Sequence, residues 1–225
     1  VLLYDHTEVE YRESGAYTHW NDAYVKILTE EARRNYGTLS SYYTIPYQRG
    51  PEDCRIDRVE ILAPSGESRK IDVEGQSRTM INPGSMGQNI YNPNDKVIQV
   101  NIPGLEIGDV LHYRMYDRIV QPRMTNTWCD WFVLESSMPI LRKSLTVHAP
   151  AALPLRSMAL KAPVGDTVTA ACETNAAEII YRWEARDVPQ FFPEPNMPAP
   201  YTVLQRLLIS TAPDKEVVDI FQAHG

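Results

Sequence analysis

Cysteine and long hydrophobic runs are scarce in this sequence, and both shortages exclude classes of protein. Only three cysteines occur in 225 residues, widely separated at Cys54, Cys129 and Cys172. An odd, widely spaced set is not a disulfide framework and lacks zinc-ligand spacing. Three free, partly buried thiols are therefore expected, and the alternative is one disulfide between two of them. No run of about 18 apolar residues exists, so no transmembrane helix is predicted.

Positive charge is also in short supply. The chain carries 22 Lys and Arg against 29 Asp and Glu, and its basic residues are scattered along the sequence. The densest basic pair, Arg33-Arg34, lies beside Glu30-Glu31. A nucleic acid or an anionic membrane needs clustered basic residues, so neither is predicted as a main partner. Segment 84–87 contains two glycines but lacks the lysine of a phosphate-binding loop, and no cofactor is predicted.

Alternation of apolar and polar residues is what the sequence has in abundance. The stretch 101–119 opens with a turn over 103–109 and continues as a long predicted strand over 110–120. Its two faces carry Leu111, Tyr113, Met115 and Ile119 on one side and His112, Arg114, Tyr116 and Arg118 on the other. A period of two is typical of a half-buried strand, and it places His112 on the wet face.

Similar patterns predict strands along the whole chain. The predicted strands cover 1–10, 16–28, 39–47, 54–63, 70–73, 78–81, 96–102, 128–135, 139–149, 153–159, 167–173 and 176–185, with an edge strand over 203–209. A short helix is predicted over 32–36, because Thr29 caps it and Gly37 ends it. Long helices between strands are missing, so the fold class is an all-β, large antiparallel sandwich with one or two short helices.

A change in composition divides the chain at residue 187. Residues 1–187 are predicted to form the β-sandwich domain. Five prolines occur in 188–200, and because proline cannot donate to a strand ladder this segment is predicted to run along the surface. Residues 188–225 then form a linker that leads to an absent downstream domain, and a short helix over 213–223 carries the apolar stripe Val217, Val218, Ile220 and Phe221.

No catalytic, cofactor-binding or metal-binding residue is predicted. Cys129 with His148 is the sharpest enzyme hypothesis, but Cys129 lies in an alternating strand with no helix after it. The neighbouring Asp130 would raise the pKa of its thiol instead of lowering it. The histidines lack metal-ligand spacing, and the paired acids lie in turns and caps, where they satisfy backbone amides.

Four aromatic residues are candidates for ligand contact. Tyr42, Tyr43, Trp128 and Trp131 would form a stacking platform for sugars if their rings were exposed. Alternating aromatics are more often core and cross-strand packing. The sequence therefore keeps a carbohydrate- or cell-wall-binding module as the alternative function.

Five blocks in order resemble one family of bacterial proteins. They cover 25–37 (VKILTEEARRNYG), 55–72 (RIDRVEILAPSGESRKID), 102–119 (IPGLEIGDVLHYRMYDRI), 138–150 (MPILRKSLTVHAP) and 181–198 (YRWEARDVPQFFPEPNMP). Together they resemble the domain-of-unknown-function family DUF3857. The resemblance implies an all-β sandwich similar to the amino-terminal domain of M1-type aminopeptidases. It also implies a non-catalytic domain that precedes a transglutaminase-like core in exported proteins.

The sequence thus predicts a non-catalytic amino-terminal β-sandwich module of a transglutaminase-like or protease-like bacterial protein. Its work would be positioning, or docking of a substrate or partner. The implied partner is the downstream transglutaminase-like domain, with a protein or glycan ligand as a further candidate. The implied location is the periplasm, the cell envelope or outside the cell. The chain begins at Val1 without a signal sequence, and this beginning carries no information on location.

Overall fold

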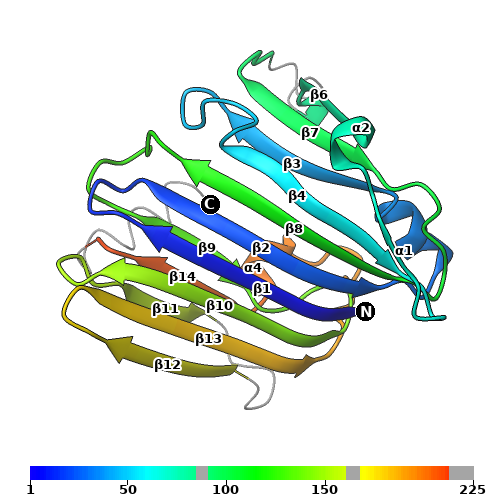
Figure 1. The fold of residues 1–225 in the computed structure, drawn as a ribbon. Helices are drawn as coiled ribbons and strands as arrows, with labels where there is room; N and C mark the ends of the chain where they lie inside the picture. The colour runs from blue at the N-terminus through cyan, green and yellow to red at the C-terminus, as the bar shows by residue number, and fades with distance from the viewer. Residues whose placement is uncertain (85–90, 161–167, 213–225) are drawn as a thin grey trace. The chain divides into compact units, whose positions relative to one another are not determined.

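The computed structural model describes residues 1–84, 91–160 and 168–212, and these residues are mostly in β-strands (Figure 1). The all-β prediction is confirmed. The chain divides into two compact units. The first comprises Val1–Thr7 and Thr18–Gln121, and the second comprises Glu8–Tyr17 and Pro122–Gly225. The predicted helix over 213–223 lies outside the described residues.

The first unit contains parts of two sheets. In the larger sheet its neighbouring strands follow the order β1, β2, β8, β4, β5. Their bounds are β1 (Leu2–Tyr11), β2 (Tyr17–Lys26), β8 (Val110–Ile119), β4 (Cys54–Leu62) and β5 (Ser68–Lys70). The other sheet has the order β3 (Thr38–Thr44), β7 (Asp95–Asn101), β6 (Ser77–Ile81). Two short helices, α1 (Glu30–Asn35) and α2 (Val73–Gln76), join these strands.

Helix α1 forms as its sequence predicts. The Thr29 hydroxyl accepts a hydrogen bond from the Ala32 amide at 3.1 Å, which satisfies one of the free amides of the first turn. Glu30 and Glu31 lie at the amino end and Arg33 and Arg34 at the carboxyl end, as the helix dipole favours. The predicted strand over 70–73 is corrected: it ends at Lys70, and Asp72 instead caps helix α2.

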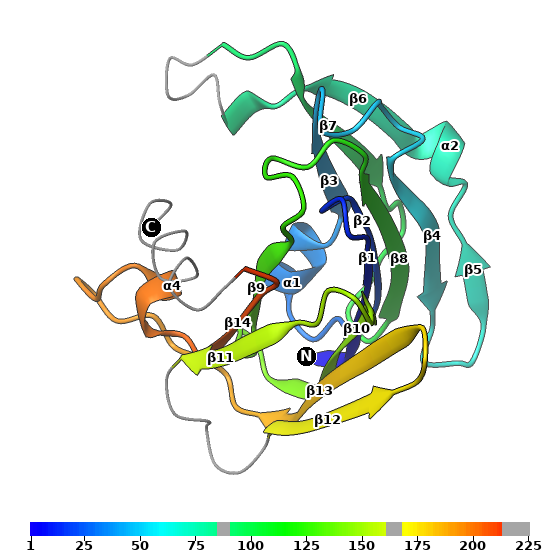
Figure 2. The same cartoon turned by 90° about the vertical axis from the view of Figure 1, so that its left-hand side faces the viewer.

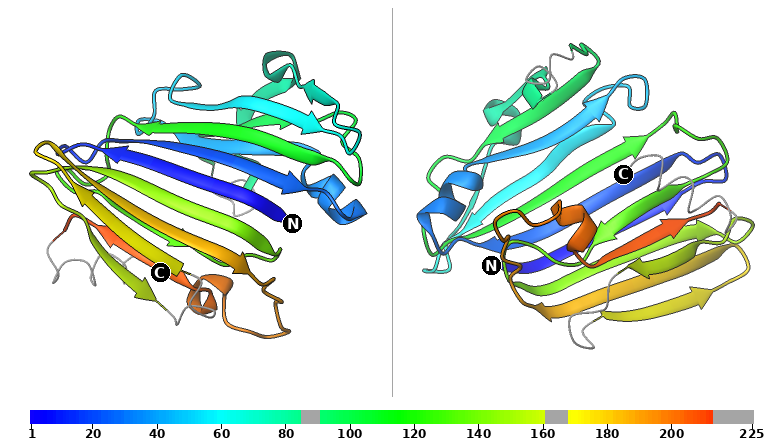
Figure 3. Two further views of the ribbon diagram at one scale, coloured as in Figure 1. Left: turned by 60° about the horizontal axis from the view of Figure 1, so that its bottom comes forward. Right: turned by 180° about the vertical axis from the view of Figure 1, so that it is seen from behind.

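The second unit has two layers of strands with a core between them. One layer has the order β12 (Val168–Thr174), β13 (Glu178–Val188), β10 (Ile140–Pro150), β1, and the other has the order β11 (Arg156–Leu160), β14 (Arg206–Ser210), β9 (Cys129–Val133). The short helix α4 (Pro200–Val203) precedes β14. Figure 2 shows β9, β14 and β11 opposite β13, and the long antiparallel pair β10–β13 lies side by side in both views of Figure 3.

The core of the second unit draws on both of its layers. Val9, Tyr11, Leu145, Val147 and Trp183 come from the first layer, and Leu207 and Ile209 come from β14. The Trp128 ring stacks on Tyr11 at a centroid distance of 4.9 Å. Because these side chains alternate along their strands, each strand contributes every second residue to the core.

Strand β14 corrects two predictions about the carboxyl-terminal part. The predicted edge strand lies between β11 and β9, so it is the central strand of its sheet. The predicted linker over 188–225 therefore contains a core strand, and residue 187 does not mark the end of the packed β structure. Prolines keep 189–199 out of the sheets, but their effect does not extend to the apolar run Leu207 to Ile209, which forms a strand.

Candidate functional site

Among the described residues of the first unit, most ion pairs involve the paired strands β4 and β8. Their register places Arg55 opposite Tyr116, Arg58 opposite Arg114, and Glu60 opposite His112. A bulge between Ile56 and Arg58 shifts this register by one residue. Because of the bulge, Arg55 and Arg58, three positions apart, both pair with even-numbered residues of β8, so charged side chains collect along these two strands.

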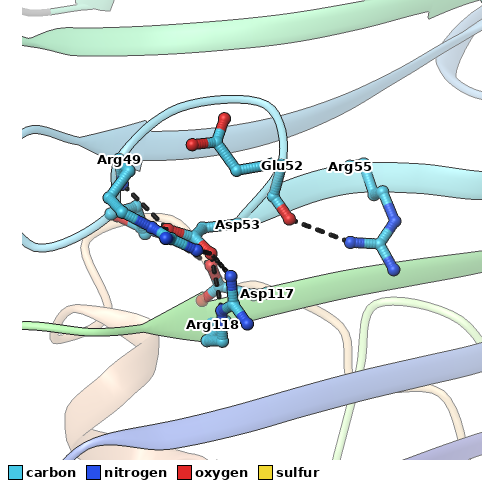
Figure 4. A network of polar contacts seen from close by, with 7 residues as sticks. Arg49, Glu52, Asp53, Arg55, Asp117 and Arg118 are labelled. Atoms are coloured by element: carbon cyan, nitrogen blue, oxygen red, sulfur yellow. Dashed lines mark hydrogen bonds and ion pairs between the residues drawn. The ribbon is translucent and has the colours of Figure 1, made fainter.

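Asp53, immediately before β4, is the centre of this network (Figure 4). Its carboxylate is fully buried and accepts hydrogen bonds from the Arg49 amide at 3.0 Å and from Arg49 Nε at 2.7 Å. Arg118 Nε, from the end of β8, donates to the same carboxylate at 2.5 Å. The hydrogen bonds from Arg49 outweigh the effect of burial and hold the pKa of Asp53 far below its usual range.

The pKa of a second carboxylate close by, that of Asp117, is shifted in the opposite direction. Burial raises the pKa of Asp117, even though Gln48 Nε2 donates a hydrogen bond to it at 2.5 Å. The charge of Asp53 contributes to this rise. One acid of the pair is therefore held ionised by two guanidinium groups, while its neighbour is pushed towards the neutral form.

His112 differs from its prediction. Its side chain is buried, not on a wet face, because neighbouring side chains on the same face cover it. The ring stacks on Tyr24 at 4.0 Å, and His112 Nε2 lies 2.7 Å from Asp22 Oδ1. Glu60, opposite it, also forms an ion pair with Arg58 at 2.7 Å, and the hydrogen bond from Arg58 lowers the pKa of Glu60.

In the second unit a hollow of about 500 Å³ is lined mainly by polar residues. His148 lies in its wall, with Nδ1 2.6 Å from Glu178 Oε1 and Nε2 3.1 Å from Glu8 Oε1. Both nitrogens of this imidazole are therefore taken by carboxylates, and this geometry fixes the ring in place.

The three cysteines are free thiols in three different settings. Cys54 is buried beside Ser41 at 3.1 Å, and burial raises its pKa to about 11. Cys129 is half-buried, and burial together with the charge of Asp130 raises its pKa. Cys172 is exposed on β12. A thiolate nucleophile needs a lowered pKa, so the setting of Cys129 opposes that chemistry.

The four candidate ligand-contact aromatics separate into two groups. Tyr43 and Trp128 are buried in the cores of the first and second units, which removes them from any exposed platform. Tyr42 and Trp131 are exposed. The reason is alternation: Tyr42 and Tyr43 point to opposite faces of β3. The Arg206 guanidinium lies over the Trp131 ring at 5.5 Å.

The described residues hold neither a metal-binding cluster nor a helix that could cross a membrane. In 1–84, 91–160 and 168–212, no group of three or more His, Cys, Asp or Glu is arranged to hold a metal ion. Within the same ranges, no helix has the length and hydrophobicity needed to cross a membrane.

The fold defines an all-β module of antiparallel sheets. The family model described as "Domain of Unknown Function with solved-structure structure (DUF3857)" matches residues 13–192. The chain therefore belongs to the DUF3857 family. No curated protein matches it.

A solved structure with a similar fold is described as a "putative protease from Parabacteroides distasonis". Its TM-score to this chain is 0.80 at 17% sequence identity, and the match covers 96% of this chain. This chain spans 41% of the length of that protein.

The Asp53 network escapes sequence reasoning. Arg49 and Asp53 are four residues apart, and this spacing in a loop is the only local signal. Arg118 is distant in sequence, and only the pairing of β4 with β8 brings it to the same carboxylate.

Proposed function

We propose that this chain is a non-catalytic module that positions or docks a partner within a larger, protease-like or transglutaminase-like protein of the bacterial envelope or exterior. The single observation that carries this proposal is how its reactive groups are engaged. The imidazole of His148 is held between two carboxylates, and the half-buried Cys129 has a raised pKa. Groups held in this way stabilise a surface, whereas catalysis needs a group that is free to exchange protons with a substrate.

The comparison with a solved structure supports the same proposal. A fold like that of this chain makes up about two fifths of a larger protein described as a "putative protease". We infer a division of labour in which bond cleavage belongs to another part of such a protein. The β module would then hold the reacting part, its substrate or another protein in place.

The first test is an activity assay on the 225-residue chain. We expect no release of product from chromogenic peptide and amide substrates, and no transfer between amide and amine substrates. The Cys129→Ala variant will match the wild type, and Cys172→Ala is the control for an exposed thiol. Turnover that disappears in Cys129→Ala but persists in Cys172→Ala would overturn the proposal.

Alkylation rates give the same test a readout that does not depend on the choice of substrate. Near neutral pH the exposed Cys172 will react with iodoacetamide faster than Cys129, because burial and Asp130 keep the Cys129 thiol protonated. A Cys129 that reacts faster than Cys172 contradicts the non-catalytic proposal.

A carbohydrate-binding module is the second candidate, and the exposed Trp131 favours it. Its ring lies on β9 with Arg206 over it, and ring and guanidinium together offer an apolar surface beside a hydrogen-bond donor. If this candidate holds, insoluble peptidoglycan will retain the wild type, and Trp131→Ala will remove that retention without lowering stability. Phe192→Ala, which removes an exposed aromatic side chain outside the four candidates, is the control. Equal retention of wild type and Trp131→Ala excludes the platform.

A further inference from the structure

We propose that the arginines around β4 and β8 bind an extended acidic peptide of a partner protein. The arginine face is defined by Arg49, Arg55, Arg58, Arg114 and Arg118. Its members come from the two neighbouring strands and the loop before β4, all within the first unit. Five of the 22 basic residues therefore lie together here, beside the acids Asp53, Asp57 and Glu60, in a chain whose net charge is −7.

Three of the four ion pairs of this face are layered, with a buried carboxylate beneath a more exposed guanidinium group. The Arg49 side chain is 56% exposed while its partner Asp53 is 0% exposed. The Arg58 side chain is 49% exposed and Glu60 is 9% exposed. Arg118 over Asp53 repeats this order, whereas the side chains of Arg55 and Asp57 are 44% and 29% exposed, so that pair is not layered in the same way. A ligand that approaches this face therefore meets guanidinium groups whose orientation is already fixed by buried acids.

An ordinary surface pair of the same unit lacks this layering. In the pair Arg33–Glu30 on α1, the arginine is 44% exposed and the glutamate is 57% exposed. A ligand there meets both charges equally, and such pairs contribute little to recognition. The layering of Arg49, Arg58 and Arg118 over their acids thus differs from the helix-surface pair on α1.

The pairing of Arg58 with Arg114 is the second observation. The two residues lie directly opposite each other in the register of β4 and β8. Like charges in this position destabilise a sheet. No ion pair of Arg114 is found among the described residues, and its side chain is exposed. A surface that keeps two opposed cations, one of them without an acid, is suited to an anion that bridges them.

The spacing favours a peptide over other polyanions. Side chains on one face of a strand recur every ~6.8 Å, because each residue rises ~3.4 Å. The acids of an extended peptide at alternate positions recur at the same interval. Arg114 and Arg118 are four residues apart on β8, two such intervals or ~13.6 Å, so every second acid of the peptide would face one of them. Duplex DNA carries one charge per ~1.7 Å, which is far denser than this row. Arg55, held over the Tyr116 ring at 3.9 Å, adds a rigid donor between the strands.

This inference deepens the proposed function, because it names the chemistry of the partner that the module would hold. It does not depend on whether the chain is catalytic. A failure to bind peptide would leave the activity assays untouched, and turnover in those assays would leave the binding result untouched.

The test measures binding of a fluorescent decapeptide of alternating Glu and Ser to the whole chain. The control peptide has Gln in place of Glu. At ~0.01 M ionic strength we expect saturable binding of the Glu peptide alone, and weaker binding at ~0.15 M, because the Debye length shortens from ~30 to ~8 Å. Arg114→Gln combined with Arg58→Gln will lower the affinity about tenfold or more, through the loss of two charge-assisted contacts.

Matched variants make the outcome decisive. Arg33→Gln removes one charge from the ordinary pair on α1 and will change the affinity less than about twofold. Arg114→Gln alone removes no ion pair and relieves the repulsion with Arg58, so it will unfold no more easily than the wild type while its binding still weakens. No binding of the Glu peptide overturns the proposal, as does an equal loss in Arg33→Gln. Tight binding of inorganic polyphosphate without binding of the peptide overturns the assignment to an acidic peptide.

Discussion

Replacing Asp53 by asparagine will lower the free energy of unfolding by roughly 3 kcal/mol, because a fully buried carboxylate that accepts from two arginines is lost. Asparagine keeps the shape but not the charge, and its amide group faces two guanidinium donors. The solvent-exposed side of both arginines limits the loss, which is why we place it at the lower end for buried ion pairs. Urea unfolding at neutral pH measures the difference.

The dependence of stability on pH gives a second test of the role of Asp53. The folded-state pKa of Asp53 lies below its ordinary value of 3.8, so protons bind more readily to the unfolded chain in that range. The stability that Asp53 contributes is present above pH 3.8 and is lost as pH falls towards the folded pKa. The difference in the free energy of unfolding between wild type and Asp53→Asn will therefore become smaller at low pH. Asp57→Asn, from the more exposed pair with Arg55, is the control at about 0.5 kcal/mol. Equal effects of the two substitutions would contradict the role of Asp53.

Replacing Trp128 by alanine will cost about 4 kcal/mol, the typical loss for a buried tryptophan. Its ring stacks on Tyr11 and meets the edge of Tyr17, and it packs with β14 and β10 in the core of the second unit. Alanine would leave a cavity that two sheets cannot both close. Chemical denaturation of the whole chain measures this loss.

Two further substitutions isolate the cause of that loss. The Trp128 indole nitrogen has no hydrogen-bond partner among the described residues. Trp128→Phe therefore loses ring volume but no hydrogen bond, and we expect it to cost about 1–2 kcal/mol. Trp131→Ala, on exposed β9, will change stability by less than about 0.5 kcal/mol. If Trp131→Ala is as costly as Trp128→Ala, the assignment of the core is wrong.

The alternation of apolar and polar residues predicts most strands of the fold, and its failures have physical reasons. It predicts β4, β8 and β10 to within one or two residues, because one face of each strand is apolar. It misjudges His112, because a polar residue can be buried by its lateral neighbours Tyr24 and Asp22 as well as by a core. It also misplaces β14, because five residues with a proline-rich approach look like an edge, while position within a sheet depends on distant partners.

The polar site is predicted less well than the fold, because it depends on register. Thr29 and the acids after it are readable as a helix cap, since all contacts of that cap are local. The meeting of Asp53 with Arg118, or of Arg58 with Arg114, requires β4 and β8 to pair with one bulge. One residue of slippage would send every one of these side chains to the other face. No local pattern in the sequence specifies that bulge.

Because β14 is the central strand of its sheet, the choice of fragment ends matters when proteins of this family are produced as recombinant fragments. The family match ends at residue 192, before β14, and starts at residue 13, after β1. A fragment trimmed to that match would lose Val9, Tyr11, Leu207 and Ile209 from one core. It would also leave β9 and β11 with open backbone edges, which invite self-association and insoluble expression. Recombinant fragments of relatives should therefore extend beyond both ends of the recognised segment.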